Sequence, residues 1–248
     1  MDQSFYIGAT GAFQQNQRMG IHGNNISNVN TQGFKAEKSR FTALMCENTR
    51  TADAGEQRTG VGSALLATST DHRPGSTNHT GRSQDYMIEG DGFFALADLA
   101  TGEISYTRNG AFMVARLEQP TSEVDENGVP IMGEGWYLSD GEGRFVLGEN
   151  GGIIPVSDAN AAQPVGVFDF VNYDGMQHAS DTRFLTAEKN GGLRFGSGKV
   201  IHGALESSNV DLADEITKVI ESQRAYSMAL KLVQTSDEIE STINGLRG

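Results

Sequence analysis

The hydrophobic period changes twice along this chain of 248 residues. Apolar and small residues recur every three to four positions from residue 2 to about residue 28. Apolar and polar residues then alternate from about residue 65 to residue 205, and the longer spacing returns from residue 208 to residue 247. A period near 3.6 indicates helix and a period of two indicates strand. The sequence therefore predicts a mainly β body with an α-helical segment at each end of the chain.

The first helical pattern has spacings of four and three, as the seam of a coiled coil does. Its members are Phe5, Ala9, Ala12, Asn16, Met19, Gly23 and Ile26. Most of them are small or polar. At roughly 25 cal/mol per Å² of buried apolar surface, this face alone cannot offset the entropy lost when the helix becomes ordered. We therefore expect this helix to need partners.

The second helical pattern follows the segment SSNVDLADEI, which supplies N-cap candidates and places acidic residues in the first turn. The seam residues are Leu212, Ile216, Val219, Gln223, Tyr226, Leu230 and Val233. After a slip in phase the apolar positions continue at Ile239, Ile243 and Leu246, and Asn244-Gly245 is a reasonable stop signal. The sequence thus carries a helical seam at both ends.

Five segments between the helices are predicted to contain strands. They are Tyr86–Asp98, Glu103–Ala115, Gly135–Gly148, Val165–Tyr173 and Lys199–Glu206. Turn clusters rich in Gly, Asn and Asp separate them. The dipeptide Asn109-Gly110 fits the centre of a type I′ hairpin, where both residues need a positive φ. We expect an all-β body that closes its own core, although the pattern alone also allows terminal helices that pack on the sheet of the same chain.

The first helix runs into the polar segment HGNNISNVNTQGFK, His22 to Lys35. Asn28, Asn30, Thr31 and Gly33 tolerate left-handed backbone geometry or bond their own backbone. They are therefore expected to end the helix and turn the chain.

Composition and motifs exclude several classes of function. The net charge of −13 supplies no basic field for nucleic acid. No apolar run approaches the roughly 18 residues that span a bilayer. The N-terminus does not resemble a secretory signal. The single cysteine, Cys46, allows no internal disulfide. The histidines lack metal-ligand spacing, and no phosphate-binding or nucleophile motif is present. We expect no catalytic residue, metal or cofactor.

Motifs at both ends and in the middle carry a resemblance to a known family. They are GAFQQNQRMGIHGNNISNVNTQGFK, then DGFFAL and YTRNGAF, and finally GALESSNVDLADEITKVIESQRAYSMALKLVQTSDE. Together, and in this order, they resemble the axial proteins of the bacterial flagellum, the rod and hook family. The length resembles that of rod subunits, because hook subunits carry extra β domains, and the C-terminal motifs are closer to distal-rod than to proximal-rod subunits.

The resemblance implies a mechanical function. The terminal helices would pair as a coiled coil and line an inner tube with those of neighbouring subunits, while the β body forms an outer shell. The tube would transmit torque and conduct exported proteins in the basal body. Implied partners are copies of the chain, other rod and hook proteins and the flagellar type III export apparatus, without nucleic acid or membrane insertion.

The assembly residues expected on this basis lie on both helices. They are Phe5, Ala9, Ala12, Met19, Ile26, Leu212, Ile216, Val219, Arg224, Tyr226, Leu230 and Val233. The joint between the layers is expected at Asn24, Asn25, Asn28, Gly33 and Phe34. The expected segments are 1–33 (helix and polar turn), 34–64 (extended connector), 65–206 (all-β domain) and 207–248 (helix).

Three hypotheses remain. The first is the polymerising rod subunit, whose residues 1–33 and 208–248 we expect to be largely disordered in the isolated monomer, because assembly supplies the area that they need to fold. The second is an adaptor of the same family that docks a scaffold and never polymerises. The third is an enzyme that cleaves the cell wall, for which the sequence offers no convergent titratable groups and no extra segment.

Overall fold

The computed structural model describes residues 3–43, 47–50, 56–59, 63–124, 130–158, 161–180 and 182–246. It has a helix at each end and strands between them, so the predicted fold class is confirmed. The chain divides into two compact units. The helical unit comprises Met1–Val29, Ala36–Asp71 and Val210–Gly248, and the β unit comprises Asn30–Lys35 and His72–Asn209.

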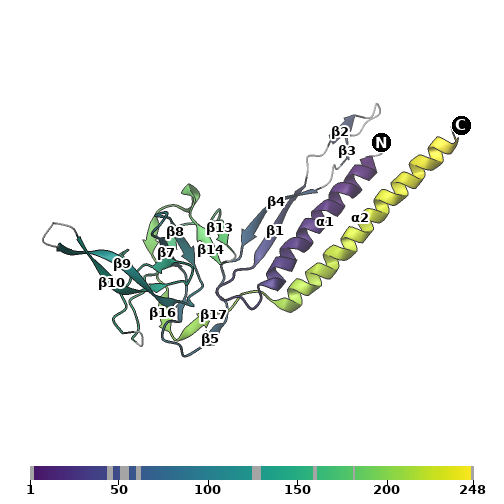
Figure 1. Cartoon of the computed structure of the whole chain (residues 1–248). Helices are drawn as coiled ribbons and strands as arrows, with labels where there is room; N and C mark the ends of the chain where they lie inside the picture. The colour runs from purple at the N-terminus through teal and green to yellow at the C-terminus, as the bar shows by residue number, and fades with distance from the viewer. Residues whose placement is uncertain are drawn as a thin grey trace. The chain divides into compact units, whose positions relative to one another are not determined.

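The helical unit contains helices α1 (Gln3–Ser27) and α2 (Leu212–Leu246), which lie side by side in Figure 1. It also contains strands β1 (Glu37–Ala43), β2 (Glu47–Arg50), β3 (Glu56–Thr59) and β4 (Ser63–Thr70). β1 pairs with β4 and β2 pairs with β3, both antiparallel. Two side chains of α1 reach the first of these ladders: Gln14 Oε1 accepts a bond from Leu65 N at 2.6 Å, and the Arg18 guanidinium lies over the Phe41 ring.

The β unit is built around an antiparallel sheet of seven strands, in the order β13-β14-β8-β7-β11-β10-β9. These strands are β7 (Phe94–Asp98), β8 (Ile104–Thr107), β9 (Met113–Val124), β10 (Pro130–Ser139), β11 (Arg144–Val146), β13 (Gln177–Ser180) and β14 (Arg183–Leu185). Three two-stranded ladders complete the unit. They pair β12 (Phe168–Phe170) with β15 (Leu193–Phe195), β16 (Lys199–His202) with β6 (Tyr86–Glu89), and β17 (Ala204–Glu206) with β5 (Thr77–His79). A short 3-10 helix, η1 (Glu188–Asn190), precedes β15.

Strand β7 lies at the centre of the core because both of its faces are buried. Phe94 and Leu96 enter one hydrophobic cluster, and Ala95, together with Phe93 just before the strand, enters another on the opposite face. Successive side chains of a strand point to opposite faces, so a strand covered on both sides is apolar at successive positions, as β7 is up to Asp98 at its end. The β unit therefore has a core of its own, as the sequence predicted.

The predicted strand segments are each shorter or more broken in the structure. The segment predicted at Tyr86–Asp98 contains β6 and β7, which Gly90 and Gly92 separate at positive φ, and Gly203, also at positive φ, separates β16 from β17. The alternation of apolar and polar residues predicts that a segment is extended, but it does not locate the turn at which a strand ends.

The predicted type I′ hairpin at Asn109-Gly110 is wrong. β8 pairs with β7 and β14 rather than with β9, and Gly110 is not among the glycines at positive φ. Glycine occupies position 110 for another reason: a Cβ there would lie 1.7 Å from Tyr86 O. The residue permits a close approach of two backbones.

Candidate functional site

The helix pair α1–α2 is antiparallel. Ser4 Oγ lies 3.0 Å from Ser236 Oγ near one end of α1, and His22 Nδ1 lies 2.6 Å from Glu215 Oε2 near the other. The two terminal helices of the chain therefore pair with each other.

Small and polar residues form the contact between the helices. A Cβ added at Gly8 would lie 2.9 Å from Val233 Cγ2 and 3.2 Å from Ala229 O, so glycine sets how closely the helices approach here. On α2 the buried residues are Glu215, Ser222 and Ser236. Of the predicted seam residues, only Ala12 is fully buried.

A buried polar cluster, which we call the Glu215 cluster, joins α1, α2 and β1. It consists of His22, Asn25, Glu37, Glu215 and Lys218. Asn25 is fully buried and donates to Glu215 Oε2 at 3.1 Å and to Glu37 O at 2.9 Å, while Glu37 N donates to Asn25 Oδ1 at 2.9 Å. Lys218 Nζ donates to Glu215 Oε1 at 3.1 Å. Because a buried amide needs all its partners, Asn25 fixes how the three elements meet.

Burial raises the pKa of Glu215, but its hydrogen bonds outweigh burial. The carboxylate accepts bonds from Asn25, His22 and Lys218, which favour the charged form, and the pKa lies below its ordinary value of 4.5. Glu215 is therefore a buried carboxylate that stays charged at neutral pH.

Within the β unit, the end of the polar turn is anchored by buried charges. Phe34 and Lys35 are buried, and Lys35 Nζ lies 2.5 Å from Glu206 Oε1. Arg108 Nη1 donates to Glu206 Oε2 at 3.2 Å, and Gly33 N donates to Glu206 O at 2.8 Å. Buried charges persist only when they are paired and hydrogen-bonded. Glu206 therefore binds residues 33–35 to the rest of the unit.

The residues predicted for the joint fall into two groups. Asn24, Asn25 and Asn28 belong to the helical unit, where Asn28 Nδ2 donates to Asn24 O at 3.1 Å at the end of α1. Gly33 and Phe34 belong to the β unit and are buried. Sequence reasoning missed His22, Lys35, Arg108, Glu206 and Glu215, because a charged residue in a sequence gives no signal of burial until its distant partner is known.

The predicted assembly residues differ in exposure. On α1, Ala12 is buried, Ala9 is exposed, and Phe5, Met19 and Ile26 are half-buried. On α2, Val219, Tyr226 and Val233 are half-buried, whereas Leu212, Ile216, Arg224 and Leu230 are exposed. Further large apolar side chains of the helices are also exposed. They are Tyr6, Phe13, Ile220, Met228, Leu232, Ile239, Ile243 and Leu246.

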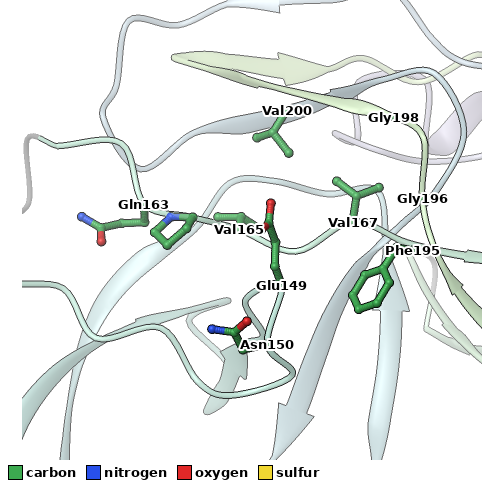
Figure 2. A pocket seen from close by; sticks show the side chains of 10 residues that line it. Glu149, Asn150, Gln163, Val165, Val167, Phe195, Gly196, Gly198 and Val200 are labelled. Atoms are coloured by element: carbon green, nitrogen blue, oxygen red, sulfur yellow. The ribbon is translucent and has the colours of Figure 1, made fainter.

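A cleft of the β unit, about 590 Å³, lies between Glu149, Phe195 and three valines, Val165, Val167 and Val200 (Figure 2). Among the described residues that line it, Glu149 is the only one with an ionisable side chain. Glycoside hydrolysis uses a pair of carboxyl groups, which the described lining of this cleft does not provide. In the part of the chain that the structure describes, no group of His, Cys, Asp and Glu side chains could hold a metal ion.

Three family profiles match the chain in the order of their motifs. "Flagella basal body rod protein" matches residues 5–35, "Flagellar hook protein FlgE/F/G D1 domain" residues 87–134, and "Flagellar basal body rod FlgEFG protein C-terminal" residues 201–246. A flagellar basal-body rod protein FlgG of Buchnera aphidicola subsp. Acyrthosiphon pisum is 31% identical, over 99% of this chain and 100% of the relative. The chain belongs to the flagellar basal-body rod protein family.

Other rod proteins match along their whole length as well. The FlgG of Bacillus subtilis is 29% identical over 100% of both chains, and the FlgF of Salmonella typhimurium is 29% identical over 99% of this chain and 98% of its own. Membership of the rod family makes the chain a structural subunit of the flagellar basal body and not an enzyme, and it implies assembly with other rod and hook proteins. No helix within the described ranges is long and apolar enough to cross a membrane.

Proposed function

We propose that copies of this chain polymerise through α1 and α2 into a helical tube that transmits torque and conducts exported proteins. In this proposal the segments 1–33 and 207–248 form the inner layer, 34–64 connects the layers, and 65–206 forms the outer layer. The partners are copies of the chain, other rod and hook proteins and the type III export apparatus, with neither nucleic acid nor membrane insertion. The support for torque transmission and for the conduit is the family to which the chain belongs.

The observation that carries the proposal is the distribution of apolar residues on the helices. Glycine, alanine, serine and a charged glutamate occupy the most buried positions of the helix pair, while the large apolar side chains of Phe13, Met228 and Leu232 are exposed. A contiguous exposed apolar surface marks an interaction site in a soluble protein. The helices therefore leave large apolar side chains available for burial against other subunits.

The assembly residues of the proposal include both exposed and half-buried positions. Leu212, Ile216 and Leu230 offer apolar side chains to a neighbour, and Arg224 offers an exposed cation of the type that often contributes to interfaces. Ala9 is exposed as well. The positions that shape the pair itself are the buried Ala12 and the half-buried Phe5, Met19, Ile26, Val219, Tyr226 and Val233. Asn24, Asn25, Asn28, Gly33 and Phe34 hold the turn between the layers.

Leu230→Asp tests the proposal. Leu230 is exposed, so the substitution should change the stability of the isolated chain by no more than about 0.5 kcal/mol. Burial of a leucine in an interface contributes about 1.5–3 kcal/mol, so the concentration at which particles form should rise about tenfold or more. Light scattering and electron microscopy measure assembly, and thermal unfolding checks that the β unit is intact.

Thr235→Asp is the matched control, because it adds the same charge to an exposed position that lies about 140° around α2 from Leu230. It should assemble at nearly the wild-type concentration. Normal assembly of Leu230→Asp, or loss of the β unit together with assembly, would contradict the assignment. A wild-type chain that stays monomeric at every concentration would instead favour the adaptor of the same family.

A further inference from the structure

The cleft of the β unit places one carboxylate among apolar side chains. Its volume of about 590 Å³ lies within the roughly 300–1,000 Å³ that is typical of sites for small ligands. Val165, Val167 and Val200 line it, and Figure 2 shows the Glu149 side chain pointing into the cleft. Within the described ranges, the Glu149 carboxylate has no ion-pair partner. A charge in this position attracts a ligand of opposite charge.

Phe195 adds an exposed aromatic ring to the cleft. Its side chain is 75% exposed, and Leu193, two residues earlier in β15, is 52% exposed. Residues two apart in a strand share a face, so Leu193 continues the apolar surface beside Phe195. The face of an aromatic ring attracts a cation. The ring therefore favours the same kind of ligand as the carboxylate does.

The basic residues nearest in sequence do not neutralise Glu149. Arg194 and Lys199 directly precede Phe195 and Val200 in β15 and β16, and successive side chains of a strand point to opposite faces. Neither basic residue lines the cleft. The charge of Glu149 is therefore open to a cation from another molecule.

The polar groups of the cleft do not favour an anion. Gln163 Nε2 donates to Asp158 O and to Ala161 O, both at 3.0 Å, so its donors are used within the chain. Asn150 adds an amide, which can donate or accept. The carboxylate of Glu149 repels anions, so the lining as a whole selects an apolar ligand that carries a positive charge.

The glycine-containing wall of the cleft is held in place by close contacts. A Cβ at Gly196 would lie 2.5 Å from Val167 Cγ1, and one at Gly198 would lie 2.5 Å from Ile88 Cγ2. Val167 and Ile88 belong to a buried hydrophobic cluster. A wall that packs on the core in this way is already ordered, so binding costs little entropy there.

We propose that this cleft binds a lysine side chain from an extended segment of a partner protein. The ammonium group pairs with Glu149, and the methylene stem lies along the valines. Lysine combines a compact cation with an apolar stem of four carbons, which matches one carboxylate among apolar side chains. The cleft is larger than one side chain, so the residues that flank the lysine contact Phe195 and Leu193. The net charge of −13 attracts basic partners to the chain as a whole.

Methyl NMR of the full-length chain, kept below the concentration at which particles form, tests the site with two synthetic peptides. The probe is acetyl-Leu-Lys-Leu-amide, and its control carries norleucine in place of lysine, which keeps the stem and removes the charge. The signals of Val165, Val167 and Val200 report occupancy of the cleft. The lysine peptide should bind about fivefold more tightly, the preference expected of one exposed ion pair with a cation–π contact.

Substitutions in the protein assign this preference to the cleft. Glu149→Gln should abolish the preference for the lysine peptide and leave the affinity for the norleucine peptide unchanged. Glu103→Gln is the matched control, because it removes the same charge from an exposed position of the β unit outside the cleft, and it should keep the preference. Phe195→Ala should weaken binding of the lysine peptide about threefold.

Three results would overturn the proposal. They are valine signals that neither peptide shifts, equal binding of the two peptides by the wild type, and a preference that survives Glu149→Gln. The site belongs to the β unit and the polymerising helices to the other unit, so each of these results would leave the proposed polymerisation standing.

Discussion

Two features of the backbone at Gly33 require a residue without a side chain. The backbone has a φ of +68°, and a Cβ would lie 2.4 Å from Asn109 N. The first condition disfavours any residue with a side chain, and the second excludes a side chain because the nearby atoms belong to the backbone. The residue lies between the polar turn and the buried Phe34 and Lys35, so it determines where the chain enters the β unit.

We expect Gly33→Ala to lower the free energy of unfolding of the β unit by about 3 kcal/mol or more, as the sum of backbone strain and overpacking. Gly81→Ala is the matched control. Gly81 has a φ of +71° with open space around its Cβ position, so it should show the backbone strain alone, about 1–2 kcal/mol. Urea denaturation measures both, and equal losses would show that the close contact with Asn109 has no effect.

Sequence reasoning identified Gly33 through its tendency to turn, but it did not identify the ion pairs beside it. Lys35 and Glu206 are 171 residues apart, and Arg108 and Glu206 are 98 apart. Each is an ordinary charged residue in its local sequence. Only the pairing of distant strands makes their burial possible.

Among the secondary-structure elements, the helices were predicted best. The pattern predicted helix from residue 2 to about residue 28 and from residue 208 to residue 247, and the structure has α1 at Gln3–Ser27 and α2 at Leu212–Leu246. Periodicity over many turns averages out local exceptions. It does not show every position that faces the partner helix, because the contact of this pair also uses Gly8 and Ser222, which lie outside the apolar pattern.

The strands were harder to predict because each is short and ends at a turn within the alternating pattern. Gly110 is an example. Its neighbours in sequence suggest a hairpin, yet glycine is needed there because the backbone of Tyr86 comes too close for a side chain. Close backbone contacts between distant segments leave no periodic signal.

The Glu215 cluster makes the helical unit sensitive to acid. Because the pKa of Glu215 is lowered in the folded protein, its stabilising effect is fully present above its ordinary pKa of 4.5 and is lost as the pH falls through the lower, folded value. The hydrogen bonds of a charged group each contribute about 1.5–3 kcal/mol. Protonation should therefore loosen the contact of α2 with α1 and β1.

Amide exchange of sedimented assemblies across pH 6 to 3 tests this effect. Protection near His22 and Lys218 should fall in the wild type as the pH drops below 4.5. In Glu215→Gln it should be low already at pH 6 and change little, since glutamine cannot ionise. The same pH profile in both proteins would show that another group is responsible.

At the scale of the whole molecule, the two units differ in how they are stabilised. The β unit has two hydrophobic clusters of its own, whereas the described residues of the helical unit include few fully buried apolar side chains and many exposed ones. A unit with little buried apolar surface gains its order from binding. We therefore expect assembly to complete the folding of this rod protein.

Amide hydrogen exchange of the purified chain, in dilute solution and at a concentration where filaments form, shows whether the helices become ordered only on assembly. We expect rapid exchange across residues 3–27 and 212–246 in the dilute monomer, strong protection of both helices in filaments, and a β unit protected in both. Helices that are equally protected in a dilute monomer, without particles at high concentration, would contradict this expectation.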